Sequence, residues 1–447
     1  MKISIIGTGY VGMVSGLCLA EKGHTVMCVD TDTEKINTIN NAILPIHERS
    51  LSDLLSAHLN KTFFAGTDLP AAVNNTEISL ICVGTPFLGN AIDLSGIRQA
   101  AREIGNALRD KDDFHAVIVK STVVPGTTDG LVRSELEKAS GKKAGVDFGI
   151  GMNPEFLREG DAVKDFLAPD RIVLGSGDER TLELMNRVYR VFEGAEFIRT
   201  NNKTAEMIKY TANSLLATLI SFSNEIGNLC AMLGDIDVVD VMAGVHKDKR
   251  FSPLLDSGER VTPGFISYLA AGCGFGGSCF PKDVKALAAH GKSAGSPMRL
   301  LDSVIRINEE QPKAVLHLLG KHFARLKGLR VAILGLAFKP DTDDMRESPA
   351  IPIVNHLLKE GAWIQAYDPV ARHEAEKLFG NHQISYFQDI PETIAGVQAV
   401  ILLTGWNEFN RVPELMLSAN PQPVFIDGRR MLAKSLFDHY EGIGLGV

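Results

Sequence analysis

The sequence KISIIGTGYVG, at residues 2–12, joins a short apolar run to a glycine-rich turn. An apolar stretch with helical spacing follows, and a second short apolar run ends at Asp30. The order of strand, GxGxxG turn, helix, strand and acid is typical of a dinucleotide-binding βαβ unit. The first glycine allows the tight turn, the second lets a pyrophosphate approach, and the third lets the helix pack on the strand. The pattern therefore predicts dinucleotide binding at Gly7, Gly9 and Gly12, with the phosphates at the helix N-terminus.

Asp30 indicates which dinucleotide binds, and the ends of later strands indicate which residues contact the ligand. An acid at the position of Asp30 accepts hydrogen bonds from the adenosine ribose, which favours NAD over NADP. Further strands are predicted at 77–83 and 116–120, and they end just before Thr85 and Thr122. Because ligands bind at the carboxyl ends of the strands in a doubly wound sheet, these hydroxyls are placed to reach a cofactor or substrate. The alternative is that both are ordinary loop threonines.

Two further pairs of polar residues follow apolar segments. A strand predicted at 148–152 leads into Glu155 and Glu159, which are either an acid–base group and a ligand contact or a solvated helix start. From 204 to about 233 the pattern is helical without strand punctuation. Lys209 and Asn213 lie four residues apart there and project from one helix face, toward either a ligand or solvent.

The stretch GCGFGGSCFPKD, at residues 272–283, combines a high density of glycines with a cysteine and a Lys-Asp pair. Glycines let the backbone pass close to a ligand where any Cβ would clash. Cys279 is a candidate nucleophile, because Lys282 would favour its thiolate. The plain alternative is a loop with an inert buried thiol.

In the last third of the chain the βαβ pattern returns after a helical region at 284–325. Its first turn carries Lys339, and a cation at the carboxyl end of a strand suits a phosphate-bearing second ligand. We therefore predict an α/β protein with two Rossmann-like doubly wound domains joined by a central helical domain. The elements predicted for the second Rossmann-like unit are strands at 330–334, 363–367, 397–403 and 424–427 and a helix at 348–359. The predicted boundaries are 1–200 for the NAD-binding domain, 201–325 for the helical domain with the cysteine loop, and 326–447 for the second nucleotide-binding domain.

The amino-acid composition restricts the classes of protein to which this chain can belong. The chain has 447 residues, 45% of them hydrophobic and 22% charged, and a net charge of −8, which gives no indication of a nucleic-acid or anionic-membrane partner. Six scattered cysteines without a CxxC or CxxH pair predict neither a metal site nor a disulfide framework. The N-terminus lacks a signal-peptide pattern, and no uninterrupted run reaches about 18 apolar residues. We expect a reduced, cytoplasmic, globular protein.

Over nearly its whole length the chain resembles the UDP-glucose/GDP-mannose dehydrogenase family, which are NAD-dependent four-electron oxidases of nucleotide sugars. The motifs that carry the resemblance are GTGYVG at 7–12, PIHE at 45–48, GTP at 84–86, STV at 121–123, NPEFLREG at 153–160, AEMIKYTAN at 205–213, GFGGSCFPKD at 274–283, FKPDTDDMRES at 338–348 and FIDGR at 425–429.

The resemblance implies a mechanism at the matching positions. A first hydride passes from C6 of the sugar to NAD, and Cys279 captures the aldehyde as a thiohemiacetal. A second hydride transfer leaves a thioester, which water hydrolyses to a uronate. Lys209 and Asn213 match donors to the oxyanion at C6, Asp283 with Thr122 matches the group that orders water, and Glu155 matches the acid–base group of hydrolysis.

The resemblance also implies the binding contacts and a dimer built through the central helices. The expected cofactor contacts are Gly7, Gly9, Tyr10, Val11, Gly12, Asp30, Lys35, Thr85, Thr122, Glu159, Lys282 and Arg346. The expected substrate contacts are Glu155, Phe156, Leu157, Lys209, Asn213, Tyr268, Leu269, Phe275, Gly276, Lys339 and Arg429, the last two facing the pyrophosphate. Related enzymes place an arginine about five residues before the position of Tyr268. Pro263 stands there and the nearest arginine is Arg260, so this part of the resemblance does not predict a contact to a partner subunit's substrate.

The identity of the sugar and of the reaction is left with alternatives. The segment at 276–283 resembles enzymes of UDP-glucose and of GDP-mannose; 165–173 resembles the former and 140–149 the latter. Taken together they favour oxidation of UDP-glucose to UDP-glucuronate, with GDP-mannose as the alternative. Two other classes are a one-step hydroxy-acid dehydrogenase, which leaves Cys279 unexplained, and a non-catalytic NAD-binding scaffold.

Overall fold

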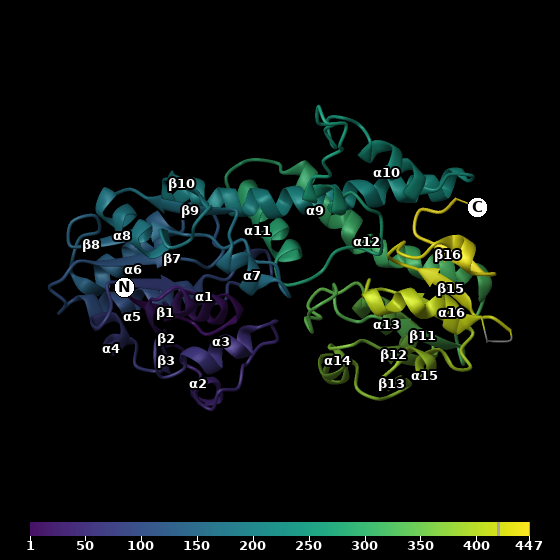
Figure 1. The fold of residues 1–447 in the computed structure, drawn as a ribbon, viewed down its shortest axis with the longest axis horizontal. Helices are drawn as coiled ribbons and strands as arrows, with labels where there is room; N and C mark the ends of the chain where they lie inside the picture. Colours follow the sequence, from purple (N-terminus) through teal and green to yellow (C-terminus); the bar gives the residue numbers. More distant parts are fainter. Residues whose placement is uncertain (418–420, 447) are drawn as a thin grey trace. The chain divides into compact units, whose positions relative to one another are not determined.

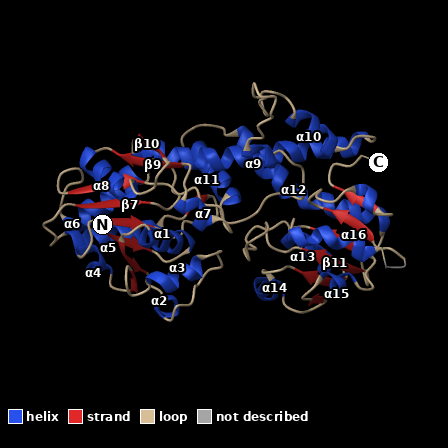
Figure 2. Cartoon of the chain, in the orientation of Figure 1, coloured by secondary structure: helices blue, strands red, loops and turns tan. Residues whose placement is uncertain are grey.

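The computed structural model describes residues 1–417 and 421–446. It divides into two compact units, Met1–Ala212 and Asn213–Val447. Each unit contains a largely parallel β-sheet with helices on its faces, as Figure 1 (purple to blue, and green to yellow) and Figure 2 show. The chain is therefore an α/β protein with two Rossmann-like units and helices between them in the sequence.

The sheet of the first unit has eight strands in the order β10-β9-β8-β7-β4-β1-β2-β3. Neighbouring strands pair in parallel except for β8 and β9, which pair antiparallel. The strands are β1 Lys2–Ile6, β2 Thr25–Val29, β3 Phe63–Gly66, β4 Ile78–Ile81, β7 His115–Val119, β8 Phe148–Met152, β9 Arg171–Ser176 and β10 Glu196–Thr200, with a separate hairpin of β5 Phe87–Leu88 and β6 Ala91–Ile92.

The side chains of β1 point alternately to the two faces of the sheet, and this explains why helices cover both faces. Ile5 packs in one buried cluster with Met13 of α1, and Ile6 packs in the other with Ile97 of α5. Successive side chains of a strand point to opposite faces, so an all-apolar strand requires helices on both. The helices are α1 Tyr10–Glu21, α2 Thr33–Asn40, α3 Leu51–His58, α4 Leu69–Asn74, α5 Ser95–Leu108, η1 Thr128–Val132, α6 Arg133–Ser140, α7 Ala162–Leu167 and α8 Glu179–Tyr189.

The sheet of the second unit has six parallel strands in the order β13-β12-β11-β14-β15-β16. Its strands are β11 Arg330–Leu334, β12 Trp363–Tyr367, β13 Ile384–Tyr386, β14 Ala399–Leu402, β15 Val424–Asp427 and β16 Tyr440–Gly442. Its helices are α10 Val238–His246, η2 Gly264–Tyr268, α11 Phe280–Ser293, α12 Arg299–His322, α13 Ala350–Lys359, α14 Arg372–Phe379, α15 Ile390–Ile394, η3 Asn407–Arg411, α16 Val412–Met416 and η4 Lys434–Leu436.

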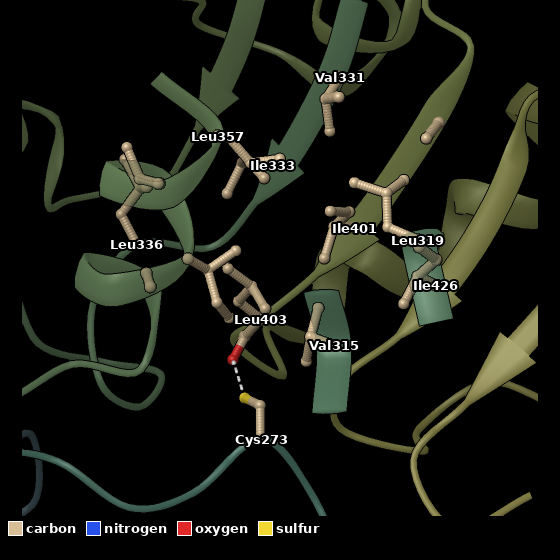
Figure 3. Packing of buried hydrophobic residues seen from close by; sticks show 14 of the residues in the cluster. Cys273, Val315, Leu319, Val331, Ile333, Leu336, Leu357, Ile401, Leu403 and Ile426 are labelled. Atoms are coloured by element: carbon tan, nitrogen blue, oxygen red, sulfur yellow. Dashed lines mark hydrogen bonds between the residues drawn. The ribbon is translucent and has the colours of Figure 1, made fainter. Parts of the chain in front are cut away.

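The core of this second sheet joins its strands to α12. Val331, Ile401 and Ile426 come from three neighbouring strands and share one buried cluster with Val315 of α12 (Figure 3). Cys273 lies at the edge of this cluster, where its Sγ donates to the carbonyl of Leu403 at 3.7 Å. Burial raises the pKa of the Cys273 thiol, so it is a neutral packing residue.

The helical region predicted at 284–325 consists of two helices in the structure, α11 and α12, separated at residues 294–298. The segment between them contains Gly295 and Pro297, which end a helix because glycine is flexible and proline lacks an N–H donor. Strands β3, β5, β6, β9, β10, β13 and β16 were not predicted.

Helix α9, Asn202–Leu233, passes the boundary between Ala212 and Asn213. Among the described helices it alone is long and apolar enough to cross a membrane, by length and composition only, and 33% of its apolar window is buried. Ser, Thr and Asn are interspersed in it, and a single helix of this kind is weak evidence because a core helix of a soluble protein passes the same test. The three-domain boundaries at 200 and 325 stay a prediction.

Candidate active site

The glycine turn after β1 is open on the side where a phosphate would approach. Gly7 has φ +101°, and a Cβ there would lie 2.9 Å from the Cys82 carbonyl oxygen. Gly9 is the N-cap of α1 without a side-chain cap, and a Cβ on it would meet nothing within 4 Å. A Cβ on Gly12 would lie 1.9 Å from the Gly7 oxygen, so the helix packs directly on the turn. Uncapped amides at a helix N-terminus fit a dinucleotide pyrophosphate at Gly7, Gly9 and the first helical residues, Tyr10 and Val11.

Asp30 directly follows β2 and is held by the same turn. One of its oxygens accepts hydrogen bonds from the N–H and the hydroxyl of Thr8, at 2.8 and 2.7 Å, and the Lys35 ammonium lies 3.3 Å from it. Partial burial by itself raises the pKa of Asp30, but the Thr8 and Asp32 hydrogen bonds and the Lys35 charge outweigh it and hold the pKa below its usual value. The carboxylate is therefore ionised and placed to accept from ribose hydroxyls.

Thr85 and Thr122 follow two neighbouring strands of the sheet, β4 and β7. The Thr85 hydroxyl donates to the Thr122 carbonyl at 2.8 Å, and its side chain is buried. The structure thus brings together the two loops that the sequence predicts at the ligand-binding edge. The Thr85 hydroxyl therefore joins the two loops, and Thr122 is half-buried.

Glu155 and Lys209 form a buried ion pair. The Lys209 Nζ lies 2.9 Å from Glu155 Oε1, with side chains 4% and 7% exposed, and the Leu157 N–H donates to Glu155 Oε2 at 2.7 Å. Burial alone raises the pKa of Glu155, but the Lys209 charge and the Leu157 hydrogen bond hold it below its ordinary value. Lys209 also lies 5.5 Å from the centre of the Phe156 ring. Neither member of the pair is the solvated residue that the alternative reading proposed.

A second buried carboxylate, Glu48, holds the segment that follows β8. It accepts a hydrogen bond from the Tyr10 hydroxyl and from the N–H groups of Gly160, at 2.7 Å, and Ala162, at 3.0 Å. Burial and the nearby carboxylates raise the pKa of Tyr10, which keeps it a neutral donor. Sequence reasoning gave Glu48 no role, although it lies in the PIHE motif at 45–48; this carboxylate fixes the loop that carries Glu159, a half-buried residue.

In the second unit Cys279 is the N-cap of α11. Its Sγ lies 3.4 Å from the Ser278 hydroxyl, and it is half-buried, whereas the other five cysteines are buried. One turn into the helix, the buried Asp283 accepts from the Asn213 amide at 2.7 Å and from the Lys282 ammonium at 2.5 Å. A helix N-terminus favours a thiolate, so the position of Cys279 suits a nucleophile.

Side-chain amides of two helices fix the glycine loop before Cys279. Asn308 of α12 accepts from the Phe275 N–H at 2.8 Å and donates to the Phe275 carbonyl at 2.9 Å. Gln311 donates to the Gly272 carbonyl, and Asn224 of α9 accepts from the Gly272 N–H, both at 2.8 Å. Sequence reasoning missed these three residues. The sequence feature that could have indicated them is an amide side chain within a predicted helix. A buried Asn or Gln needs a hydrogen-bond partner, and here that partner is the backbone of the glycine loop.

The Arg429 guanidinium ties three segments together. It donates to the carbonyls of Leu403 at 2.6 Å, Gly274 at 3.0 Å and Phe338 at 3.2 Å. A guanidinium carries five N–H donors, so two are left for a phosphate oxygen. The expected pyrophosphate contact of Arg429 stays a prediction, and so does that of Lys339, whose ammonium lies 5.8 Å from the Phe338 ring centre.

The remaining predicted contacts lie around the glycine loop and η2. Tyr268, the last residue of η2, has its ring centre 6.1 Å from that of Phe280, and the Phe275 ring centre lies 6.0 Å from that of Phe280. Leu269 is buried. A Cβ on Gly276 would lie 2.4 Å from the carbonyl oxygen of Glu347, so only glycine fits there.

Arg346 is exposed and paired with Asp344 at 2.8 Å. Among residues 1–417 and 421–446, no group of three or more His, Cys, Asp or Glu side chains is arranged to hold a metal ion.

Three models of one family match this chain in succession. Residues 1–193 match the NAD binding domain of the UDP-glucose/GDP-mannose dehydrogenase family. Residues 203–310 match its central domain, and residues 332–434 match its UDP binding domain. NAD is therefore the dinucleotide for which the glycine turn and Asp30 are built, and a nucleotide sugar is the second ligand.

Whole-chain relatives agree with these matches. The chain is 40% identical to "UDP-glucose 6-dehydrogenase TuaD" of Bacillus subtilis (strain 168), covering 97% of this chain and 90% of that protein. It is 39% identical to a GDP-mannose 6-dehydrogenase of Pseudomonas aeruginosa, covering 91% and 92%. The solved structure of a UDP-glucose dehydrogenase from Pyrobaculum islandicum superposes with a TM-score of 0.89 at 36% identity, covering 99% and 98%. With its glycine turn, its acid after β2 and its cysteine at a helix N-terminus, the chain belongs to the UDP-glucose/GDP-mannose dehydrogenase family.

Proposed function

We propose that this chain is a UDP-glucose 6-dehydrogenase. One UDP-glucose, two NAD and one water give one UDP-glucuronate and two NADH, with protons released to solvent. The observation that carries the proposal is Cys279 at the N-terminus of α11, one turn before an Asp283 that is buried and held by Asn213 and Lys282. A one-step alcohol dehydrogenase has no need of a nucleophile, whereas oxidation to an acid through a thioester requires one.

The chemistry assigns a separate task to the cysteine. NAD, when bound, accepts a hydride from C6 in each of the two oxidations. The Cys279 thiolate adds to the C6 aldehyde and forms a C–S bond, and this adduct donates hydride far more readily than the aldehyde itself. The second oxidation leaves a thioester on Cys279. Water attacks its carbonyl, the C–S bond breaks, and the uronate leaves with the thiolate restored.

Polar donors stabilise the oxygen at C6 through these steps. We assign this task to Lys209 and Asn213, one turn apart on α9. The Asn213 amide has two N–H groups and donates one to Asp283, which leaves one for the substrate. Asp283 is held in place by two donors and suits the ordering of water near the thioester, together with Thr122.

Glu155 has the charge state of a base. Its pKa is held below the ordinary value, so it is a carboxylate at neutral pH, able to accept a proton from the attacking water. When Lys209 donates to the developing oxyanion, its attraction for Glu155 weakens and Glu155 becomes a stronger base. The ion pair thus couples oxidation to hydrolysis.

The choice of sugar rests on the relatives. UDP-glucose is favoured because the relative at 40% identity and the superposed structure both carry that name. GDP-mannose is the second candidate, because a GDP-mannose 6-dehydrogenase is 39% identical over 91% of the chain. The same cysteine chemistry serves either sugar.

We also infer a cytoplasmic homodimer formed through α9. Leu215, Phe222 and Leu229 are 58%, 50% and 49% exposed and recur every seven residues along this helix. A seven-residue apolar repeat is the pattern of a helix that packs on another helix. A second copy of the chain is the partner of matching chemistry, since the same stripe faces its equivalent across a two-fold axis.

The test is the total NADH formed from a limiting amount of sugar nucleotide, with UDP-glucose and GDP-mannose assayed in parallel. About two NADH per UDP-glucose is expected. About one NADH would refute the role of Cys279 as the nucleophile, because the reaction would then stop at the aldehyde. Two NADH from GDP-mannose alone would replace the proposed substrate by the second candidate.

A further inference from the structure

Lys120 is a buried lysine to which the reaction as described assigns no task. It directly follows β7, just before the Ser121-Thr122 loop, and is 3% exposed. Its Nζ donates to Asn153 Oδ1 at 2.8 Å. The Phe166 and Tyr189 rings lie 5.5 and 5.7 Å from the ammonium and enclose it. Because an ammonium in an apolar enclosure is costly, its presence requires a compensating partner.

Asn153 connects Lys120 to the loop of Glu155. Its Oδ1 accepts from Lys120 and from the Tyr189 hydroxyl, at 2.5 Å, and its Nδ2 donates to the Val173 carbonyl at 2.8 Å. Its own N–H donates to the Val119 carbonyl at 2.9 Å, beside Lys120 in the chain. Asn153 is thus held on every side, and Glu155 lies two residues after it.

The charges that face Lys120 come from four elements. The interacting groups are Glu155 after β8, Lys209 on α9, Cys82 after β4 and Tyr189 at the end of α8. Burial raises the pKa of Cys82 to about 12 and raises that of Tyr189 as well, so both are neutral near pH 7. Glu155 is therefore the anion among these groups, and it interacts with two lysines, Lys209 directly and Lys120 at longer range.

We propose that Lys120 is a positioning residue for Glu155, which fixes the loop through Asn153 and supplies the positive charge that remains when Lys209 turns to the substrate. The proposal rests on the proposed function, in which Lys209 donates to the oxygen at C6. An ion pair broken inside a protein leaves an uncompensated charge, which is strongly unfavourable. Lys120 donates to Asn153 and lies beside the Phe166 and Tyr189 rings, all groups of the protein itself, so its charge is expected to persist through the reaction.

Two variants distinguish the effect of the Lys120 charge from the effect of its hydrogen bond. Lys120→Gln removes the charge and keeps an N–H donor for Asn153, whereas Lys120→Met removes both. Lys111→Gln is the matched control: Lys111 precedes the same strand β7 and donates to the Val73 carbonyl at 2.7 Å. Asn153→Asp adds an anion beside Lys120 without removing the lysine, and it serves if the Lys120 variants do not fold.

The readout is the pH dependence of kcat/KM for UDP-glucose. Loss of the cation raises the pKa of Glu155, so the acidic limb is expected to move up by about one pH unit in Lys120→Gln and Lys120→Met. Asn153→Asp is also expected to move the acidic limb to higher pH, whereas Lys111→Gln is expected to leave the acidic limb unchanged. An unmoved limb in the Lys120 variants and in Asn153→Asp would overturn the proposal, even where overall activity has fallen.

The same experiment distinguishes failure of the proposed function. Wild-type NADH yield is measured alongside, and two NADH per sugar with an unmoved limb would leave the function standing and remove Lys120 from it. If the wild type forms no NADH from either sugar, the proposed function fails. The inference is then tested by the pH dependence of the free energy of unfolding below neutral pH, where Lys120→Gln is expected to begin losing stability at a higher pH than the wild type because Glu155 protonates earlier. Parallel pH dependences of the two unfolding free energies would overturn it.

Discussion

The buried Lys120 makes the stability of the first unit depend on alkaline pH, and its removal gives a prediction with a definite size. Burial lowers the pKa of Lys120 from 10.5 to about 8. In the range between these values the unfolded chain binds a proton that the folded chain does not, so stability rises with pH. Each unit of pKa shift corresponds to about 1.4 kcal/mol. The cost of burying this lysine is thus about 3 kcal/mol below pH 8, and it vanishes above the unfolded pKa.

The perturbation is Lys120→Met, compared with the wild type in urea at about pH 7.5 and about pH 10. Between these two conditions the wild type is expected to gain about 2 kcal/mol relative to the variant, because at the higher pH part of the unfolded lysine is still protonated. The measured quantity is the urea midpoint followed by far-ultraviolet circular dichroism. Lys138→Met, on the exposed side of α6, is the control and is expected to leave the pH slope unchanged. Parallel pH curves for the wild type and Lys120→Met would show that Lys120 keeps its proton when buried and would refute this reasoning.

Three other predictions concern the site and the assembly. Cys279→Ser is expected to bind both ligands but to lower the NADH yield from two to one or fewer per UDP-glucose; an unchanged yield would mean that the thiol is not the nucleophile. Gly12→Ala places a Cβ 1.9 Å from the Gly7 oxygen, so KM for NAD is expected to rise by at least about tenfold with the yield per sugar unchanged, and an unaltered KM would contradict the packing of α1 on the turn. Leu229→Asp in the exposed stripe of α9 is expected to give a monomer by light scattering, whereas Leu378→Asp, at 50% exposure on α14, leaves the dimer intact; a monomeric wild type would refute the dimer.

Local sequence pattern was sufficient for the elements that position the cofactor. Strands β1 and β8 in the first unit and β11, β12 and β15 in the second have the predicted bounds, because each is a short apolar run closed by Gly, Asp or Asn. Edge strands such as β10 were missed because their side chains are largely exposed and show no apolar run. The Gly-Thr-Gly turn and Asp30 were readable for the same local reason: a positive φ and a close helix approach require glycine at fixed spacing.

The charge states of the buried ionisable residues in the site could not be predicted from local sequence pattern. Glu155 and Lys209 are 54 positions apart in the sequence, and each alone was as compatible with solvent as with a ligand. Their 2.9 Å contact exists because the loop after β8 and the start of α9 pack together in the first unit. Lys120 was read as the last residue of a strand, and its partners Asn153 and Tyr189 come from two other elements.

The sequence by itself therefore determined the family, the cofactor and the two Rossmann-like units, and it singled out Cys279 as the candidate nucleophile. These depend on residues close together in the chain, where backbone geometry allows few alternatives. Only the tertiary structure showed which buried charges compensate one another. It also showed that the Asn213 amide donates to Asp283 and that the Arg429 guanidinium donates to three backbone carbonyls. The physical reason is that a buried polar group must find its partner across the packing of separate elements, and no local pattern specifies that distance.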